Sequence, residues 1–216
     1  VDSTTCLGMA VEKYGKENVI ALSVYYGQKH TKEIESAKKV CEYYGVEMKE
    51  LDLTVIFSDS KCSLLSHSDE EIPQESYAKQ ISETNGKPVS TYVPFRNGLF
   101  LSAAASIALS NDCSVLYYGA HADDAAGSAY PDCSTDFYNA MNKAIYEGSG
   151  KQIKVEAPFI SWTKAEVVKK GLELGVPYKY TWSCYNGKDK PCGKCGTCID
   201  RTKAIELNGV KDPALD

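Results

Sequence analysis

The chain has no run of about 18 consecutive apolar residues, the length that a helix needs to cross a bilayer, so no membrane span is expected. It also lacks positive charge: 24 Lys and Arg stand against 29 Asp and Glu, a formal net charge of −5. This balance argues against a large nucleic acid as the main partner. No secretory signal is visible, which predicts a reducing, cytoplasmic location.

Several catalytic signatures are missing as well. The sequence contains no GxSxG and no HExxH. The stretch "EGSGKQ" resembles a nucleotide P-loop, but Ile145 stands where the first glycine belongs, and no Ser or Thr follows Lys151. Cysteine is too sparse for a disulfide scaffold, with nine in 216 residues. Five of them stand alone and are expected to be small buried hydrophobic residues: Cys6, Cys41, Cys62, Cys113 and Cys133.

Short β-rich runs alternate with helical patterns along the chain. Strands are predicted within 18–26, 46–53, 113–120 and 153–160, and helices within 2–14, 31–44, 97–112, 135–148 and 163–174. Such alternation is typical of an α/β fold, here a doubly wound, mostly parallel sheet with helices on both faces. We expect one domain over residues 1–216. The polar stretch 58–92 breaks the rhythm and is predicted to be a lid, with partial disorder as the alternative.

The first predicted helix opens with Asp2-Ser3-Thr4-Thr5, which places hydroxyls and unpaired N–H groups where an anion could bind. A plain helix cap with an acidic first turn explains the same residues. This stretch alone is therefore weak evidence for a phosphate site.

The strongest local signal is a set of four cysteines in fifteen positions, Cys184, Cys192, Cys195 and Cys198. Their spacing suits Zn²⁺ or an iron–sulfur cluster, and we favour zinc because the run lacks a Cys-Pro ending. A closed shell of four thiolates leaves no position for substrate, so the 181–203 segment is predicted to be structural.

The charge of this cysteine segment does not favour a nucleic-acid site. Four thiolates with one Zn²⁺ contribute −2, which leaves a net charge of about +1. The charged side chains counted are Lys188, Lys190, Lys194, Arg201 and Lys203 against Asp189 and Asp200. The cations largely compensate the metal site.

Taken together, five segments resemble the 7-cyano-7-deazaguanine synthase family, ATP-using enzymes of queuosine-precursor biosynthesis in the ATP pyrophosphatase loop superfamily. They are "DSTTCL", "YYGQKHTKEIESA", "STYVPFRNGLFLSAAASIA", "GAHADD…YPDCSTDF" and "TWSCYNG…CGKCGTC…R". The resemblance runs nearly end to end and implies an adenine-nucleotide alpha-hydrolase-like fold. Each segment is modest evidence, but five in order are highly specific.

The resemblance implies a ligase reaction. ATP adenylates the carboxylate of 7-carboxy-7-deazaguanine, ammonia displaces AMP to give the amide, and a second ATP activates the amide before the nitrile forms. Mg²⁺ is expected with ATP because the metal spreads phosphate charge. The expected partners are therefore small molecules, with no nucleic acid and no membrane. Oligomeric state is left open, a homodimer being one expectation.

The resemblance also assigns residues, of which Asp2, Ser3, Arg96 and Lys164 would be catalytic. The nucleotide side would comprise Asp2, Ser3, Thr4, Thr5, Cys6, Leu7, Gln28 and His30, and the substrate side Arg96, Asn97, Asp124, Tyr130 and Asp132. Arg96 can bind an anion through its guanidinium fork. A helix-entry role for His30, a solvated cap for Arg96 and a surface turn around Pro131 remain alternatives. Arg201 could reach the site or pair with a thiolate.

Three departures from the family pattern leave questions open. The chain begins inside the nucleotide motif, so the family's first strand and its SGG are expected to be missing. The segment between Asp124 and Tyr130 looks longer than usual, and Ser134 stands where Arg commonly follows YPDC.

Two alternative functions remain. One is a related ATP pyrophosphatase acting on tRNA, either a thiolase using Cys133 or a lysidine-type ligase. The other is a non-enzymatic zinc module that binds RNA.

Overall fold

The computed structural model describes residues 1–187 and 189–215, so Lys188, counted above among the cations of the cysteine segment, lies outside the described residues. The α-helices are α1 (Asp2–Tyr14), α2 (Lys32–Tyr44), α3 (Tyr77–Glu83), α4 (Arg96–Ser110), α5 (Ala122–Ala125), α6 (Thr135–Gly148), α7 (Lys164–Glu173) and α8 (Gly196–Glu206). The strands are β1 (Ile20–Tyr25), β2 (Glu47–Asp52), β3 (Val115–Tyr117) and β4 (Lys154–Glu156).

The predicted helix ends are confirmed where a local signal marks them. Helix α2 ends at Gly45, whose φ of 66° is the left-handed cap that glycine adopts without strain. Helix α7 begins with the predicted capping box. There the Thr163 side chain accepts from the Glu166 N–H, and the Glu166 carboxylate accepts from the Thr163 N–H at 2.7 Å.

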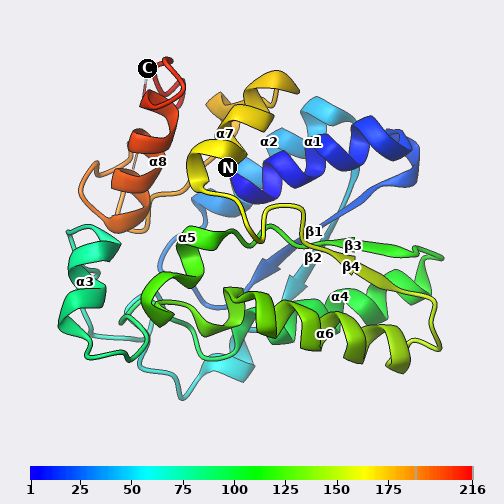
Figure 1. Cartoon of the computed structure of the whole chain (residues 1–216), viewed down its shortest axis with the longest axis horizontal. Helices are drawn as coiled ribbons and strands as arrows, with labels where there is room; N and C mark the ends of the chain where they lie inside the picture. Colours follow the sequence, from blue (N-terminus) through cyan, green and yellow to red (C-terminus); the bar gives the residue numbers. More distant parts are fainter. Residues whose placement is uncertain (188, 216) are drawn as a thin grey trace.

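The strands form two parallel pairs. β1 pairs with β2 over six residues each, and β3 pairs with β4 over three. Within residues 1–187 and 189–215 the two pairs are separate sheets. The α/β class with parallel strands is confirmed, whereas one continuous doubly wound sheet is not. Helices lie on both sides of the strands, with α1, α2 and α7 on one side and α4 and α6 on the other (Figure 1).

The cysteine segment is anchored on two sides. Cys184, Cys195 and Cys198 belong to a buried cluster with Tyr26, which follows β1, and with Leu65. A second buried cluster joins α7 to α8, and its members are Val1, Val168, Val176, Tyr178, Ala204 and Ile205. The cysteines therefore pack against the carboxyl end of β1 and do not form a separate appendage.

The polar stretch 58–92 is more ordered than its sequence pattern predicts. It contains the seven-residue helix α3, whose N-cap Ser76 accepts a hydrogen bond from the Lys79 N–H. Its apolar residues are too few to produce a helical period, so pattern reading missed this helix.

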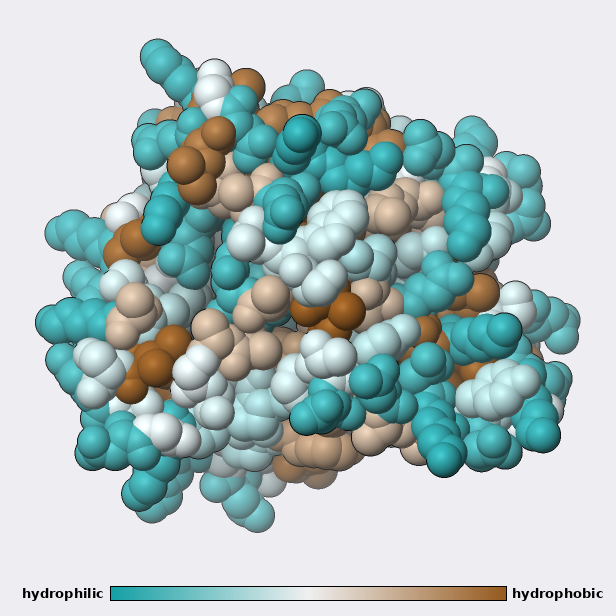
Figure 2. All heavy atoms as spheres, in the orientation of Figure 1, coloured by the Kyte–Doolittle hydropathy of each residue, from teal (hydrophilic) through white to brown (hydrophobic). Residues whose placement is uncertain are grey.

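The described helices include none that is both long and apolar enough to cross a membrane. On the face shown in Figure 2, hydrophobic side chains are scattered in small groups among hydrophilic ones. Single exposed hydrophobic residues of this kind are normal on protein surfaces.

Candidate active site and cysteine cluster

Four side chains from distant parts of the chain meet at the start of α1. Lys164 Nζ donates to Asp2 Oδ2 and lies 3.3 Å from His121 Nε2. The same His121 nitrogen is 3.2 Å from Asp124 Oδ2 and 3.8 Å from Asp2 Oδ1. His121 is only 3% exposed. The structure thus brings together three residues that the sequence proposed separately, Asp2, Asp124 and Lys164, and adds His121.

The electrostatics of this cluster favour ionised Asp2 and Lys164. Burial by itself would raise the pKa of Asp2, but Lys164 and His121 outweigh it and hold that pKa well below its usual range. Burial likewise opposes the charge on Lys164, yet Asp2 and Asp124 raise the pKa of the ammonium group. For Asp124, burial dominates and raises the pKa of the carboxyl, although His121 and Lys164 act in the opposite direction.

A glycine lets the start of α1 approach the end of β3. A Cβ on Gly119 would lie 3.2 Å from the Ser3 backbone nitrogen and 3.3 Å from the Asp2 carbonyl carbon. Ser3 is exposed and Thr4 is half-buried. The first N–H groups of a helix have no intrahelical acceptor, so this end of α1 presents donors and a positive dipole end.

The remaining residues of "DSTTCL" face the interior of the fold. Thr5 is fully buried, and its hydroxyl bonds the Val1 carbonyl at 2.9 Å and the Tyr178 hydroxyl at 2.9 Å. Cys6 lies in an apolar cluster with Phe159 and Val167, and Leu7 is half-buried. Their side chains therefore secure α1 against its neighbours, and any phosphate contact from them would come through the backbone.

Arg96 is a cation without a carboxylate partner within 4 Å in the described part of the chain. Its guanidinium carbon lies 5.3 Å from the Tyr26 ring centroid and 5.6 Å from that of Phe100. One nitrogen donates to the Tyr26 hydroxyl at 3.3 Å, while the buried Nε lacks a hydrogen-bond partner. A buried donor without an acceptor is costly, so this group is suited to receive an anion.

Asn97 and Asp132 bond to each other. The Asp132 carboxylate accepts the Asn97 N–H at 2.9 Å near the start of α4, and Tyr118 donates to the Asp132 carbonyl. The Asn97 amide donates to the Cys133 sulfur at 3.3 Å. Asp132 is 3% exposed, so in this structure it stabilises the helix start. Its predicted contact with substrate stays a prediction.

Tyr130 belongs to a chain of hydroxyl groups. Its oxygen is 2.7 Å from Thr91 Oγ1 and 3.0 Å from the Tyr77 hydroxyl, which in turn donates to Tyr185 at 3.3 Å. Tyr77 lies on α3 and Tyr185 follows the first cysteine of the cluster. The turn considered for this stretch is present: Pro131 is exposed at the start of a short 3-10 turn over Pro131–Cys133, whereas Tyr130 on one side and Asp132 on the other are buried.

Gln28 and His30 lie just beyond the end of β1. Gln28 is buried, and its side-chain oxygen accepts the Tyr26 N–H at 2.9 Å. His30 lies edge-on to Trp182 with ring centroids 6.3 Å apart, and its Nδ1 is buried without a partner. Each of the two therefore keeps a side-chain nitrogen without a hydrogen-bond partner in the described residues, Nε2 in Gln28 and Nδ1 in His30.

The four cysteines converge as predicted. The sulfur atoms of Cys184, Cys192, Cys195 and Cys198 all lie within 4.8 Å of one another, and those of Cys184 and Cys195 are 4.0 Å apart. Backbone N–H groups of Asn186 and Cys192 point at the Cys184 sulfur at 3.4 and 3.2 Å. Such donors stabilise thiolate charge, and the set can hold one metal ion.

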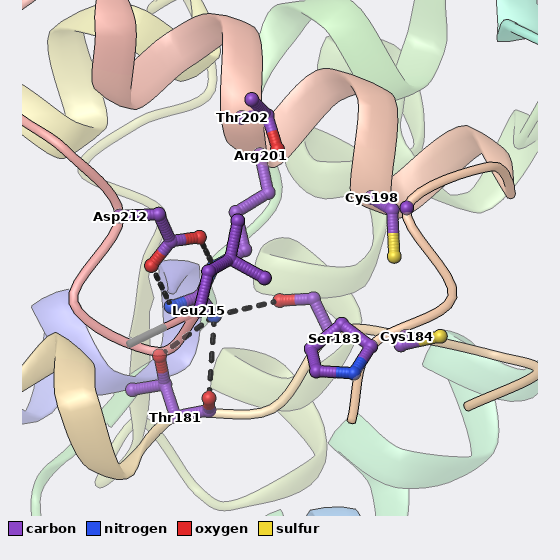
Figure 3. Close-up of a pocket in the computed structure, with 10 residues that line it drawn as sticks. Thr181, Ser183, Cys184, Cys198, Arg201, Thr202, Asp212 and Leu215 are labelled. Atoms are coloured by element: carbon purple, nitrogen blue, oxygen red, sulfur yellow. Dashed lines mark hydrogen bonds and ion pairs between the residues drawn. The ribbon is translucent and has the colours of Figure 1, made fainter. Parts of the chain in front are cut away.

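Arg201 does not reach the active site or a thiolate, contrary to both roles considered for it. Its guanidinium pairs with Asp212 at 2.6 and 2.9 Å and donates to Thr181 Oγ1 at 2.8 Å. Figure 3 shows Arg201 pointing away from the sulfurs of Cys184 and Cys198, beside a small cavity of about 30 Å³. The tail beyond α8 supplies this carboxylate, which no local pattern could reveal.

His121 is the functional candidate that sequence reasoning missed. It stands two residues after Gly119, just beyond the carboxyl end of β3. Ligand-binding groups concentrate at that end of strands in α/β sheets, so its position was the available signal. Its ring is buried and its Nδ1 lacks a hydrogen-bond partner in the described residues.

Comparison with known proteins identifies the family of the chain. The family model described as "Queuosine biosynthesis protein QueC" matches residues 1–209. A 7-cyano-7-deazaguanine synthase of Archaeoglobus fulgidus is 42% identical over 216 residues, covering 100% of this chain and 86% of that protein. One from Caldicellulosiruptor bescii is 42% identical over 213 residues, covering 99% and 91%.

Among solved structures, the U34-tRNA thiolase NcsA from Methanococcus maripaludis with its [4Fe-4S] cluster aligns with 94% of this chain and 63% of that chain. The alignment has 19% identity and a TM-score of 0.49. The family match spans nearly the whole sequence, and the relatives are similar over their near-full lengths. The chain therefore belongs to the QueC family of queuosine biosynthesis proteins.

Proposed function

We propose that this enzyme is an ATP-dependent ligase that converts 7-carboxy-7-deazaguanine and ammonia into 7-cyano-7-deazaguanine. The observation that carries the proposal is the convergence of Asp2, Asp124 and Lys164 at the start of α1. The carboxylate has a poor leaving group, so ATP must first adenylate it with release of pyrophosphate, after which ammonia attacks the acyl adenylate and displaces AMP. Charge on the departing pyrophosphate needs fixed positive groups at this point.

The start of α1 supplies those groups. Its N–H donors, with Lys164, would bind the departing pyrophosphate. Asp2 would hold the Mg²⁺ that accompanies ATP, because its Oδ1 lacks a hydrogen-bond partner and carboxylate oxygen suits a hard cation. When bound, magnesium would neutralise part of the phosphate charge. Asp124 would be a second oxygen ligand or accept an N–H of the substrate.

Arg96 would orient the substrate carboxylate or a phosphate. Aromatic rings of Tyr26 and Phe100 hold its guanidinium in place, and its Nε remains without an acceptor. A preformed, poorly solvated donor loses little reorganisation energy when an anion arrives. Positioning of this kind accounts for much of the rate that two bound reactants gain.

The four cysteines would hold structural zinc. Four ligands at about 2.3 Å in a tetrahedron are about 3.8 Å apart, and the cysteine sulfurs lie within 4.8 Å of one another. The separations therefore fit one ion. All four positions are filled by thiolates, so the metal would contribute folding energy and no step of the reaction.

The related thiolase function is less favoured because Cys133 is poorly suited to react. Burial, followed by the nearby Asp124 and Asp132 carboxylates, raises the pKa of its thiol to about 12. A Cys133→Ala variant should retain ATP-dependent product formation. If Cys133→Ala lost product formation while still binding ATP, the thiolase function would be supported.

The direct test incubates the full-length protein with ATP, Mg²⁺, ammonia and 7-carboxy-7-deazaguanine, and follows amide and nitrile by mass spectrometry. Lys164→Met should reduce turnover by about 100- to 1,000-fold, the usual loss for one group that stabilises transition-state charge. Lys169→Met, exposed on the same helix, is the control. AMP release without either product would refute the substrate assignment.

A further inference from the structure

The segment between Ser63 and Ser90 is a long loop whose two ends lie next to each other. The Ser63 N–H and hydroxyl both donate to the Ser90 carbonyl, at 3.1 and 3.2 Å. Its start is also tied to the end of β1, where Gly27 accepts the Ser66 N–H at 2.8 Å. Residues 67–89 are thus a loop with fixed ends: near one end Ile72 is buried in the cluster that contains Cys184, and at the other end Val89 is buried in the cluster that contains Tyr130. The stretch between these two residues can move as a unit.

Helix α3 docks the middle of this loop through one face. Tyr77 and Ile81 are one turn apart, and each lies over a glycine. A Cβ on Gly196, at the start of α8, would lie 3.1 Å from Tyr77 Cζ, and a Cβ on Gly127 would clash with Ile81 Cγ2. The helix therefore bridges the cysteine cluster and the loop that follows Asp124.

Hydrogen bonds reinforce the contact at Tyr77. Its hydroxyl accepts from Tyr130 at 3.0 Å and donates to Tyr185 at 3.3 Å, while the Tyr77 and Tyr130 rings meet edge-on at 5.7 Å. Tyr130 is a substrate candidate, and Tyr185 is the neighbour of Cys184. One hydroxyl thus links the substrate segment to the metal-binding segment.

The docked face also carries a defect. Gln80, between the two anchors, is 6% exposed, and its side-chain oxygen has no partner in the described residues. Its amide nitrogen donates to the Glu75 carbonyl at 2.9 Å. An unsatisfied buried acceptor destabilises the docked state relative to an open one in which water bonds it. This keeps the docking reversible.

We propose that residues 67–89 are a lid over the substrate segment, latched by Tyr77, and that the cysteine cluster provides its docking surface. Tyr77 is then a positioning residue that acts through Tyr130. The metal would influence turnover by holding Tyr185 and Gly196 where the latch closes. The effect on substrate rests on the proposed function, whereas the latch itself does not.

Hydrogen–deuterium exchange of the intact, metal-loaded protein without substrate tests the latch. Tyr77→Phe should speed exchange of the 67–89 amides by roughly 5- to 30-fold, the effect of two lost hydrogen bonds. Gln80→Leu should slow it, because the unpaired oxygen is removed. Tyr43→Phe, at an exposed tyrosine of α2, is the control. Unchanged exchange in Tyr77→Phe, or faster exchange in Gln80→Leu, would overturn the proposal.

Metal removal tests whether the cysteine cluster supports the latch, and kinetics test whether the latch affects the substrate. Chelation should speed exchange in 67–89 in the wild type and add little in Tyr77→Phe, and equal acceleration in both would exclude the coupling. If Tyr77→Phe folds poorly, Ile81→Ala removes the other anchor and should give the same exchange signature. In turnover, Tyr77→Phe should raise KM for 7-carboxy-7-deazaguanine more than KM for ATP. A wild type without turnover would refute the reaction but leave the exchange result standing.

Discussion

Removing the carboxylate of Asp212 should strongly destabilise the C-terminal part of the enzyme. Arg201 and Asp212 are 5% and 7% exposed and form two hydrogen bonds, at 2.6 and 2.9 Å. Arg201 also donates to the Tyr178 and Thr181 carbonyls, at 3.2 and 3.3 Å. In Asp212→Ala, the guanidinium would stay buried without its counter-charge.

The expected magnitude follows from that burial. Breaking a buried ion pair by removing one partner costs about 3–5 kcal/mol. For a chain of this size, each kcal/mol lowers Tm by about 2–4 °C, so the drop should be about 6–20 °C. An apolar replacement of both partners removes the stranded charge. The double variant Arg201→Met/Asp212→Leu should therefore be more stable than Asp212→Ala.

Thermal unfolding followed by far-UV circular dichroism measures both effects, with metal content checked in each sample. Glu206→Ala, an exposed acid on the same helix as Arg201, is the control and should shift Tm by less than about 2 °C. A Tm drop below about 3 °C in Asp212→Ala would show that the pair is solvated in solution. The structural account of Arg201 would then be wrong.

Three further predictions concern the active site and the metal. Because burial raises the pKa of the Asp124 carboxyl, the folded state loses stability as pH rises and this group ionises. Asp124→Asn should therefore have a higher Tm than the wild type at pH 8, with a smaller gain at pH 5. The same variant should lose activity. A larger gain at pH 5 would contradict this sign. Gly119→Ala should displace the start of α1 and lower kcat/KM at least about tenfold, whereas Gly148→Ala, with open space around its Cβ, should retain full kcat/KM. Removing the metal by chelation should unfold the cysteine segment and lower activity indirectly, as seen by limited proteolysis beyond residue 181; full activity after complete removal would count against this role.

Some site residues could be placed from sequence because the resemblance to a known family assigned them. In the structure Asp2 and Lys164 begin helices α1 and α7, and Asp124 lies on the short helix α5 beyond the carboxyl end of β3, which are positions where ligand-binding groups gather in α/β folds. The first turn of a helix is an unusual place for a cation, and that marked Lys164 as functional. In the structure Asp2 and Asp124 provide the compensating charge.

Other placements depended on what surrounds a residue. Thr5 and Cys6 stand in the nucleotide motif, yet their side chains pack into the protein because α1 buries one face against α7 and its neighbours. The resemblance assigns Asp132 to the substrate side, and the sequence does not reveal that its carboxylate accepts the Asn97 N–H. Helical period predicts that a residue is inside, but not which group it will meet.

Most of the local elements and the family could be read from the sequence alone, although helix α3 could not. The helix stop at Gly45 and the capping box at Thr163 depend on residues within a few positions of one another, and the four cysteines lie within fifteen positions. Three-dimensional packing brings His121 into the α1 cluster, pairs Arg201 with Asp212 and docks α3 over two glycines. Those contacts join residues far apart in sequence, and their geometry depends on how whole elements pack, which no local period encodes.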